Sequence, residues 1–213
     1  MQQDFKSKLP PHVKLVVVSK MRPLEQIERL YHAGQRVFGE NRPQELKTKY
    51  EALPKDIEWH FIGHLQKNKI KYIAPFVSLI HSIDSFSLLQ EVNRYAEKYN
   101  RIIPCLLQFY IAQEETKYGF SLEECENMLI NPLFSSLKNI IITGVMGMAT
   151  FTENKDAIRE EFQKLYQYFT RIKNHYFAEQ SEFKEISMGM SDDYRVAIEE
   201  GSTMVRIGSA IFL

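Results

Sequence analysis

The stretch that decides the fold is Lys14-Leu15-Val16-Val17-Val18-Ser19-Lys20, in which four consecutive apolar residues lead into a serine and a lysine. A strand with one solvated face alternates apolar and polar residues, whereas a parallel strand covered on both faces reads as an unbroken apolar run. Ile140-Ile141-Ile142 repeats the unbroken pattern much later in the chain. Both stretches therefore predict parallel strands that are buried on two faces.

Around these two stretches, strand-like runs alternate with longer amphipathic runs of helical period, and no Pro/Gly/Ser-rich linker interrupts them. The strand-like runs are 14–18, 36–38, 58–62, 78–81, 103–109, 140–145, 184–187 and 203–206. The helical runs are 24–33, 43–53, 68–74, 86–99, 122–130, 155–177 and 192–200. The pattern predicts about eight strands, each separated from the next by a helix.

Parallel strands joined by helices require right-handed crossovers, and eight such units close into a barrel. We therefore predict an α/β fold, a (β/α)8 TIM barrel in which residues 1–213 form a single domain. Its 213 residues are few for this class, in which about 250 is typical. An open doubly wound sheet is the alternative, because periodicity does not distinguish a closed sheet from an open one.

Composition excludes several classes of function. The 27 basic residues balance the 27 acidic residues, so no global field favours nucleic acid or an acidic membrane. The two cysteines, Cys105 and Cys125, lack the spacing of a zinc site or a disulfide framework, which favours a reducing compartment. Residues 1–8 lack the apolar core of a signal peptide, and no run is long enough to span a membrane. We expect a cytoplasmic protein with neither nucleic acid nor membrane as a partner.

In a barrel of this kind, the functional groups lie where the strands end. Lys20 follows the first strand, where burial of a charged amine is costly unless the amine is paired or used. Periodicity alone favours a lysine that extends into solvent at the strand end, and an amine used in chemistry is the other interpretation. His60 and His64 straddle a strand end and a glycine, so we expect no metal site from them.

The loops after the last two strands are both rich in small and hydroxyl-bearing residues. The first contains Ser187 and continues to Ser191, which we interpret as the N-cap of the following helix. The second contains Gly208 and Ser209. These two loops form the usual phosphate site of TIM barrels, and Gly208 and Ser209 are the better candidates because acidic residues follow Ser191.

Several segments together resemble the YggS/PROSC family of pyridoxal 5'-phosphate (PLP) homeostasis proteins, in order and over nearly the whole chain. These segments are Phe38-Gly39-Glu40-Asn41, Trp59-His60-Phe61-Ile62-Gly63 with Leu65-Gln66 and Asn68-Lys69, His81-Ser82-Ile83-Asp84, Ser187-Met188-Gly189-Met190-Ser191-Asp192-Asp193, and Gly201-Ser202-Thr203-Met204-Val205-Arg206-Ile207-Gly208.

The resemblance implies a PLP-binding barrel similar to the N-terminal domain of alanine racemase. It implies that Lys20 forms a Schiff base with PLP and that Arg206 faces the pyridine nitrogen. It further implies phosphate contacts from Ser187, Gly208 and Ser209, and places Asn41 beside the ring. An arginine at the pyridine nitrogen keeps that atom unprotonated, which weakens the ring as an electron sink.

The expected function is PLP homeostasis, by buffering or delivery of the cofactor, without efficient catalysis and hence without a catalytic residue. We interpret the short chain as leaving no room for the second domain of alanine racemase, and Tyr118 as a substitution rather than a base. The alternatives are a minimal PLP-dependent racemase or lyase, and a phosphosugar enzyme with Glu40 as base. PLP-dependent client enzymes are the possible partners, and we expect a monomer or a weak homodimer.

Overall fold

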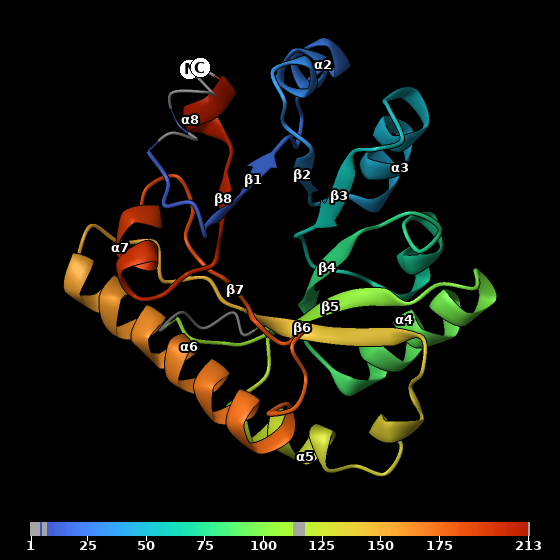
Figure 1. Cartoon of the computed structure of the whole chain (residues 1–213), viewed down its shortest axis with the longest axis vertical. Coiled ribbons are helices and arrows are strands. Elements are labelled where there is room, and N and C mark those ends of the chain that lie inside the picture. The colour runs from blue at the N-terminus through green and yellow to red at the C-terminus, as the bar shows by residue number, and fades with distance from the viewer. Residues whose placement is uncertain (1–4, 6–7, 113–117, 213) are drawn as a thin grey trace.

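The eight strands pair in parallel and in sequence order, and the last closes onto the first to give a barrel (Figure 1). The computed structural model describes residues 5, 8–112 and 118–212. The strands are β1 Lys14–Val18, β2 Val37–Glu40, β3 Glu58–Phe61, β4 Leu79–Ile83, β5 Ile103–Gln108, β6 Ile140–Met146, β7 Glu185–Ser187 and β8 Met204–Ile207. The predicted barrel is confirmed, and the open sheet is wrong because β1 pairs with β8 over four residues.

Helical segments follow the strands and surround the sheet (Figure 1). The α-helices are α2 Leu24–His32, α3 Pro43–Ala52, α4 Phe86–Lys98, α5 Leu122–Leu129, α6 Lys155–Tyr176, α7 Tyr194–Glu199 and α8 Ser209–Phe212. The 3₁₀ helices are η1 Lys67–Tyr72 and η2 Phe134–Ser136. All predicted strands and helical runs are present, and their ends differ by only a few residues.

The segment after β3 differs from an ordinary α-helix. Its backbone N–H groups bond three residues back, from Lys69 to Gln66 and from Ile73 to Ile70, which is the 3₁₀ pattern. Ile70 is the residue of η1 that is buried. A short turn is therefore enough to cover this part of the barrel, and periodicity alone cannot distinguish such a turn from an α-helix.

Three helices begin at side chains that the sequence provides for the purpose. Ser85 accepts a bond from the Leu88 backbone N–H at the start of α4. Ser121 and Glu124 form a capping box at α5, and Asn154 caps α6. These residues satisfy backbone donors that lack partners in the first turn, and each therefore fixes where its helix begins.

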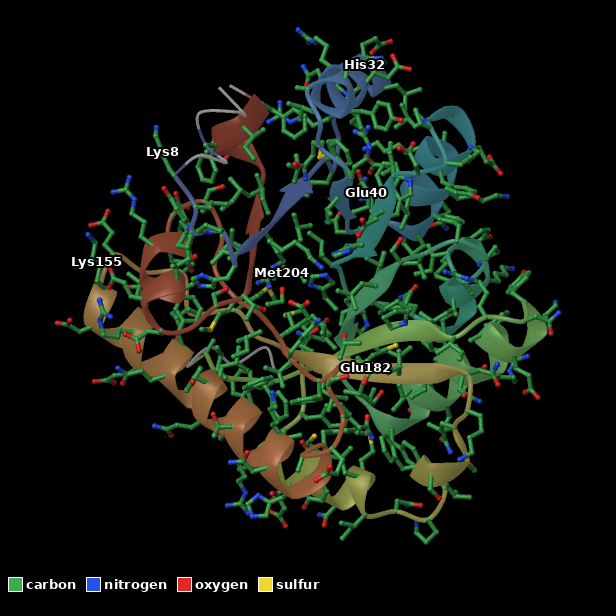
Figure 2. All side chains as sticks on the ribbon, viewed as in Figure 1. Lys8, His32, Glu40, Lys155, Glu182 and Met204 are labelled. Carbon is green, nitrogen blue, oxygen red and sulfur yellow. The ribbon has the colours of Figure 1, made fainter. Side chains whose placement is uncertain are left out.

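The apolar core has two layers. The large layer lies between the strands and the helices, and a small separate cluster contains Val16, Leu79, Leu106, Met146 and Met204, which come from five different strands. Since side chains alternate across a strand, residues two apart from these also point into the barrel. Figure 2 shows Glu40 and Met204, both fully buried, toward the centre of the molecule.

None of the helices in the described part of the chain combines the length and apolar character needed to cross a lipid bilayer. Both cysteines are buried and unpaired.

Candidate functional site

A cavity of about 530 Å³ opens at the carboxyl ends of the strands, within the range of about 300–1,000 Å³ that is usual for ligand pockets. Its walls come from nearly every side of the barrel mouth. The lining residues are Val18, Lys20, Arg22, Asn41, Ile62, Gly63, His64, Gln108, Tyr118, Met148, Phe151, Met190, Ser191, Asp192, Arg206, Gly208 and Ser209. Five of the six predicted cofactor-binding residues are therefore brought together here, namely Lys20, Asn41, Arg206, Gly208 and Ser209.

Lys20 lies in the turn directly after β1 and its side chain is exposed. Lys20 thus extends into solvent, as periodicity favours, while Ser19 takes the inward position at the strand end and is fully buried. Met21 follows with φ of +59°, a left-handed conformation that is uncommon for residues other than glycine. The turn therefore presents Lys20 to the cavity while its two neighbours anchor the backbone.

A buried ionic cluster holds this turn in place from below. Lys49 of α3 donates to the Ser19 carbonyl, to Glu40 and to Glu45, each at 2.7 Å. The Ser19 hydroxyl donates to Glu40 Oε1 at 2.6 Å, and the Met21 backbone N–H donates to Glu45 at 2.7 Å. Lys49 thus neutralises two carboxylates that bind the residues on either side of Lys20.

The two carboxylates of this cluster differ in their environment. Burial raises the pKa of Glu40, although the hydrogen bonds from Lys49 and Ser19 oppose the shift. Burial also acts to raise the pKa of Glu45, but the bonds from Lys49 and the Met21 N–H outweigh it and the net pKa is lowered. Glu40 does not line the cavity, so the geometry gives it no position as a base for a phosphosugar reaction.

Arg206 of β8 points into the barrel and lines the floor of the cavity. Its Nη1 donates to the carbonyl and the hydroxyl of Ser187 at 2.8 and 2.6 Å, and Nη2 donates to the Gly147 carbonyl at 3.1 Å. Burial lowers the pKa of Arg206 to about 10, against the opposing charge of Asp193, so the guanidinium stays charged at neutral pH. One Nη2–H and the Nε–H have no partner among the described residues.

Ser187 was expected to contact phosphate, but the structure places it elsewhere. It is fully buried in β7, it does not line the cavity, and its hydroxyl contacts Arg206 and His81. Ser187 is therefore one step removed from the cavity, behind Arg206. The sequence does not show that Ser187 is the last residue of the strand, because it does not distinguish a strand end from the first residue of the following loop.

Ser191 is the residue of this loop that reaches the cavity. The expectation that Ser191 caps the next helix is wrong: Asp193 occupies the N-cap position of α7 without a side-chain cap, and its carboxylate accepts instead from the Met190 N–H at 2.5 Å. Ser191 faces the β8 loop, where the Ser209 hydroxyl lies 3.4 Å from its own. The available signal in the sequence was the pair of acidic residues after Ser191, because either of them can occupy the N-cap position in its place.

Two glycines allow the backbone to come close at the rim of the cavity. A Cβ on Gly208 would lie 3.3 Å from Cβ and O of Val18, and a Cβ on Gly63 would lie 2.5 Å from the Asn41 carbonyl oxygen. The loop after β3 is thus packed directly on the end of β2. Gly63 is required for Asn41 to hold its place in the wall.

The opposite wall carries groups that can exchange protons. His64 Nδ1 lies 3.2 Å from Asp84 Oδ2, and the His64 and Tyr118 rings are 4.6 Å apart. Both rings line the cavity. In the described residues no group of three His, Cys, Asp or Glu side chains is arranged to hold a metal ion.

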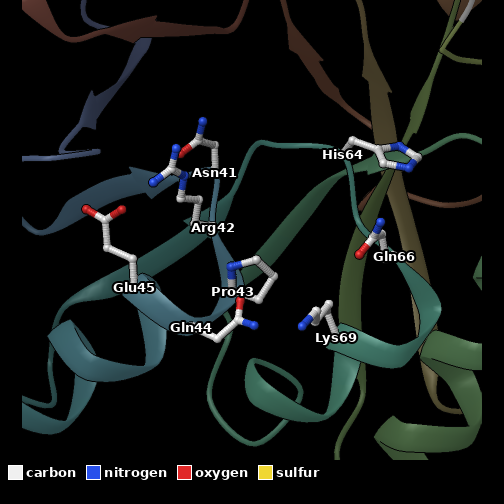
Figure 3. Close-up of a pocket in the computed structure, with 8 residues that line it drawn as sticks. All are labelled: Asn41, Arg42, Pro43, Gln44, Glu45, His64, Gln66 and Lys69. Carbon is white, nitrogen blue, oxygen red and sulfur yellow. The ribbon is translucent and has the colours of Figure 1, made fainter.

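A second cleft of about 450 Å³ lies beside the first, between α3 and η1 (Figure 3). It shares Asn41 and His64 with the larger cavity. Gln66 and Lys69, which belong to the motif after β3, line this cleft rather than the larger cavity. The segment that contains Gln66 and Lys69 therefore forms the outer side of the barrel mouth.

Known proteins are similar to this chain in both sequence and fold. The family model of the alanine racemase N-terminal domain matches residues 3–213. The pyridoxal phosphate homeostasis protein of Aquifex aeolicus is 41% identical over 200 residues, which cover 93% of this chain and 86% of that protein. The structure of PipY from Synechococcus elongatus with PLP bound superposes with a TM-score of 0.89 at 32% identity, and covers 100% of this chain and 98% of PipY.

Alanine racemase of Clostridium difficile is a more distant structural neighbour. It superposes with a TM-score of 0.73 at 13% identity over 99% of this chain and 54% of the racemase chain, which shows a shared barrel fold. The sequence and structural matches together establish that this chain belongs to the family of pyridoxal phosphate homeostasis proteins.

Proposed function

We propose that the cavity binds PLP covalently through Lys20 and that the protein takes part in PLP homeostasis, by buffering or delivering the cofactor without efficient catalysis. One observation carries the proposal: a single cavity joins an exposed lysine, a charged arginine on the floor and two hydroxyl-bearing loops. These are the groups that an aldehyde, a pyridine nitrogen and a phosphate require. PipY, with PLP bound in its structure, supports the same assignment.

The described residues fit PLP group by group. Ser191, Gly208 and Ser209 would hold the phosphate, because two hydroxyl groups and a close-packed glycine meet between the loops after β7 and β8. Asn41 would lie beside the ring. The free N–H groups of Arg206 would donate to the pyridine nitrogen. Asp192 also lines the cavity, and its charge would oppose a phosphate that lay close to it.

PLP supplies an aldehyde that condenses with a neutral amine and releases one water molecule. Lys20 provides that amine at the cavity wall, held by the cluster around Lys49. Protonated Arg206 would donate to the ring nitrogen of bound PLP and would so keep that nitrogen from accepting a proton. A ring held in this state stabilises a carbanion poorly, and this supports a binding role rather than rapid turnover.

The wider proposal concerns the whole chain. We infer that residues 1–213 act as a single PLP-binding domain, that PLP-dependent enzymes receive the cofactor from it, and that it is a monomer or a weak homodimer. The family model supports the first inference, since it runs from residue 3 to residue 213. The exposed position of Lys20 supports the second, because an exposed amine allows a bound aldehyde to be passed on.

A minimal racemase or lyase is the second candidate function. The observation that favours it is the position of His64, which Asp84 orients and which shares the cavity wall with Tyr118. An imidazole oriented by a carboxylate can act as a general acid or base. Holoprotein incubated with L-amino acids would then produce D-isomers or keto acids, and His64→Gln would abolish that activity.

The covalent proposal is tested by reconstitution. Protein soaked with PLP is expected to be yellow, and borohydride is expected to fix the cofactor on Lys20 as identified by peptide mass. Lys20→Ala should remain colourless, whereas Lys67→Ala, which alters an exposed lysine of η1 outside the cavity, should label normally. A colourless parent protein, or a label on another lysine, contradicts the proposal.

A further inference from the structure

A chain of buried polar groups runs through the barrel interior beneath the cavity. Arg206 Nη1 contacts the Ser187 hydroxyl at 2.6 Å, that hydroxyl lies 2.9 Å from His81 Nδ1, and His81 Nε2 lies 3.0 Å from His60 Nδ1. All four residues are at most 4% exposed. The chain therefore joins β8, β7, β4 and β3 across the barrel.

The register of the strands explains how the four side chains meet. Arg206 pairs with Val16, Ser187 with Met204, and His60 with Leu79, and these partners belong to the small cluster inside the barrel. Paired residues of adjacent parallel strands point to the same side. His81 is two residues beyond Leu79 and points inward with it. The polar chain thus lies where a TIM barrel ordinarily packs apolar side chains.

The direction of every hydrogen bond follows from the arginine. A guanidinium can only donate, so the Ser187 oxygen accepts from Arg206. Among the described residues, His81 Nδ1 is the neighbour placed to accept the Ser187 proton, and to do so it must be unprotonated. His81 consequently carries its proton on Nε2 and donates to His60 Nδ1, and His60 carries its proton on Nε2 as well.

The electrostatic surroundings keep both rings neutral. Burial lowers the pKa of His60 to about 3, helped by Lys14, and burial lowers the pKa of His81 well below its usual value, helped by His60, Arg206 and Lys14. Lys14 in turn lies 3.8 Å from Glu185. Protonation of either ring would place a second positive charge near Arg206 and is therefore disfavoured. At neutral pH each hydrogen bond from Arg206 to His60 keeps the donor and acceptor given above.

We propose that Ser187, His81 and His60 are positioning residues for Arg206, which lock its guanidinium so that its two free N–H groups face the cavity. Three of its five N–H groups are held by Ser187 and the Gly147 carbonyl. The remaining two would then be available to the ring nitrogen of bound PLP. This role rests on the proposed function, whereas the bond directions are a property of the protein without cofactor.

The bond directions are tested by ¹⁵N NMR of histidine-labelled protein without PLP. Two imidazoles are expected to show a protonated Nε2 and an unprotonated Nδ1, with no titration between pH 5 and 8. His81→Asn and His60→Asn assign the two signals. A His81 ring protonated on Nδ1, or one that titrates in this range, overturns the proposal.

The effect of these buried polar residues on PLP binding is tested by substituting them. His81→Leu leaves the Ser187 proton without an acceptor, and Ser187→Ala removes one of the three acceptors that hold Arg206. Both are expected to weaken PLP binding at least about tenfold and to shift the pH titration of the bound chromophore. His81→Asn, whose amide oxygen can take the place of Nδ1, should restore most of the parent behaviour.

Ser202→Ala is the matched control. Ser202 is fully buried and its hydroxyl contacts the carbonyls of Ile186, Met188 and Met204, outside the polar chain. Its loss should lower the melting temperature without moving the chromophore titration. If His81→Leu also leaves the titration unchanged, the positioning role is wrong. A parent protein that binds no PLP contradicts the proposed function and the cofactor role together, while the NMR result still decides the bond directions.

Discussion

At the scale of single residues, the buried ammonium of Lys49 holds the turn that carries the exposed side chain of Lys20. It is 4% exposed, it bonds two carboxylates and a backbone carbonyl, and it lies beneath the turn that carries Lys20. Glu40 is fully buried, and its Oε2 has no partner among the described residues. This carboxylate therefore depends on Lys49 and Ser19 for its charge to be tolerated.

Replacing Lys49 with methionine is expected to reduce the free energy of unfolding by about 3–5 kcal/mol, because the change leaves buried carboxylates without a counter-charge. Chemical denaturation measures the loss. Lys47→Met, on the same helix and paired in the described part of the chain with exposed Glu51, should cost under about 1 kcal/mol. In Lys49→Met, Lys20 should also react with PLP more slowly. Equal effects of the two substitutions would show that the cluster does not stabilise the turn.

At the scale of elements, the walls of the cavity are formed by loops that pack against neighbouring strand ends and loops. The loop after β3 packs on the end of β2, and the loops after β7 and β8 bring Ser191 and Ser209 together. α7 begins after Asp193 rather than after Ser191, so Ser191 lies in the loop and contacts Ser209. The geometry of the cavity therefore depends on where each helix begins as much as on the strands.

Gly63→Ala tests this dependence. The new Cβ would lie 2.5 Å from the Asn41 carbonyl oxygen, so the two loops must separate. We expect PLP affinity to fall several-fold while the barrel stays folded, as measured by absorbance titration and circular dichroism. Ala33→Gly, at the end of α2, is a control for a Gly/Ala exchange far from the cavity. Unchanged affinity in Gly63→Ala would mean that the wall formed by Asn41 is not needed.

At the scale of the whole molecule, a closed barrel with histidines in its interior should be acid-sensitive. His60 and His81 have pKa values lowered by burial in the folded protein, while an unfolded histidine titrates near 6.5. Below that value the unfolded chain binds more protons than the folded one. Stability is therefore fully present above about pH 6.5 and is lost as the pH falls.

The expected slope is about 1.4 kcal/mol of unfolding free energy per pH unit for each of the two histidines. Denaturant titrations between pH 6.5 and 5 measure it. His81→Asn should remove about half of the slope, since one of the two groups no longer titrates. A parent and a variant with the same slope would contradict the assignment of acid sensitivity to the barrel interior.

The sequence by itself determined parallel strands alternating with helices, because unbroken apolar runs at 15–18 and 140–142 and a regular strand–helix alternation are local patterns. It also predicted Lys20, Gly208 and Ser209 as site residues from their positions at strand ends, while the role of Arg206 followed from the family resemblance. Only the tertiary structure decided that the sheet closes, by pairing β1 with β8, and which side chain of a loop faces the cavity. Ser191 rather than Ser187 lines the cavity, because the inward or outward direction of a residue depends on the exact end of its strand and on where the next helix begins. The polar chain from Arg206 to His60 was likewise invisible in the sequence, since its members are separated by up to 146 positions and meet only because β3, β4, β7 and β8 close around one interior.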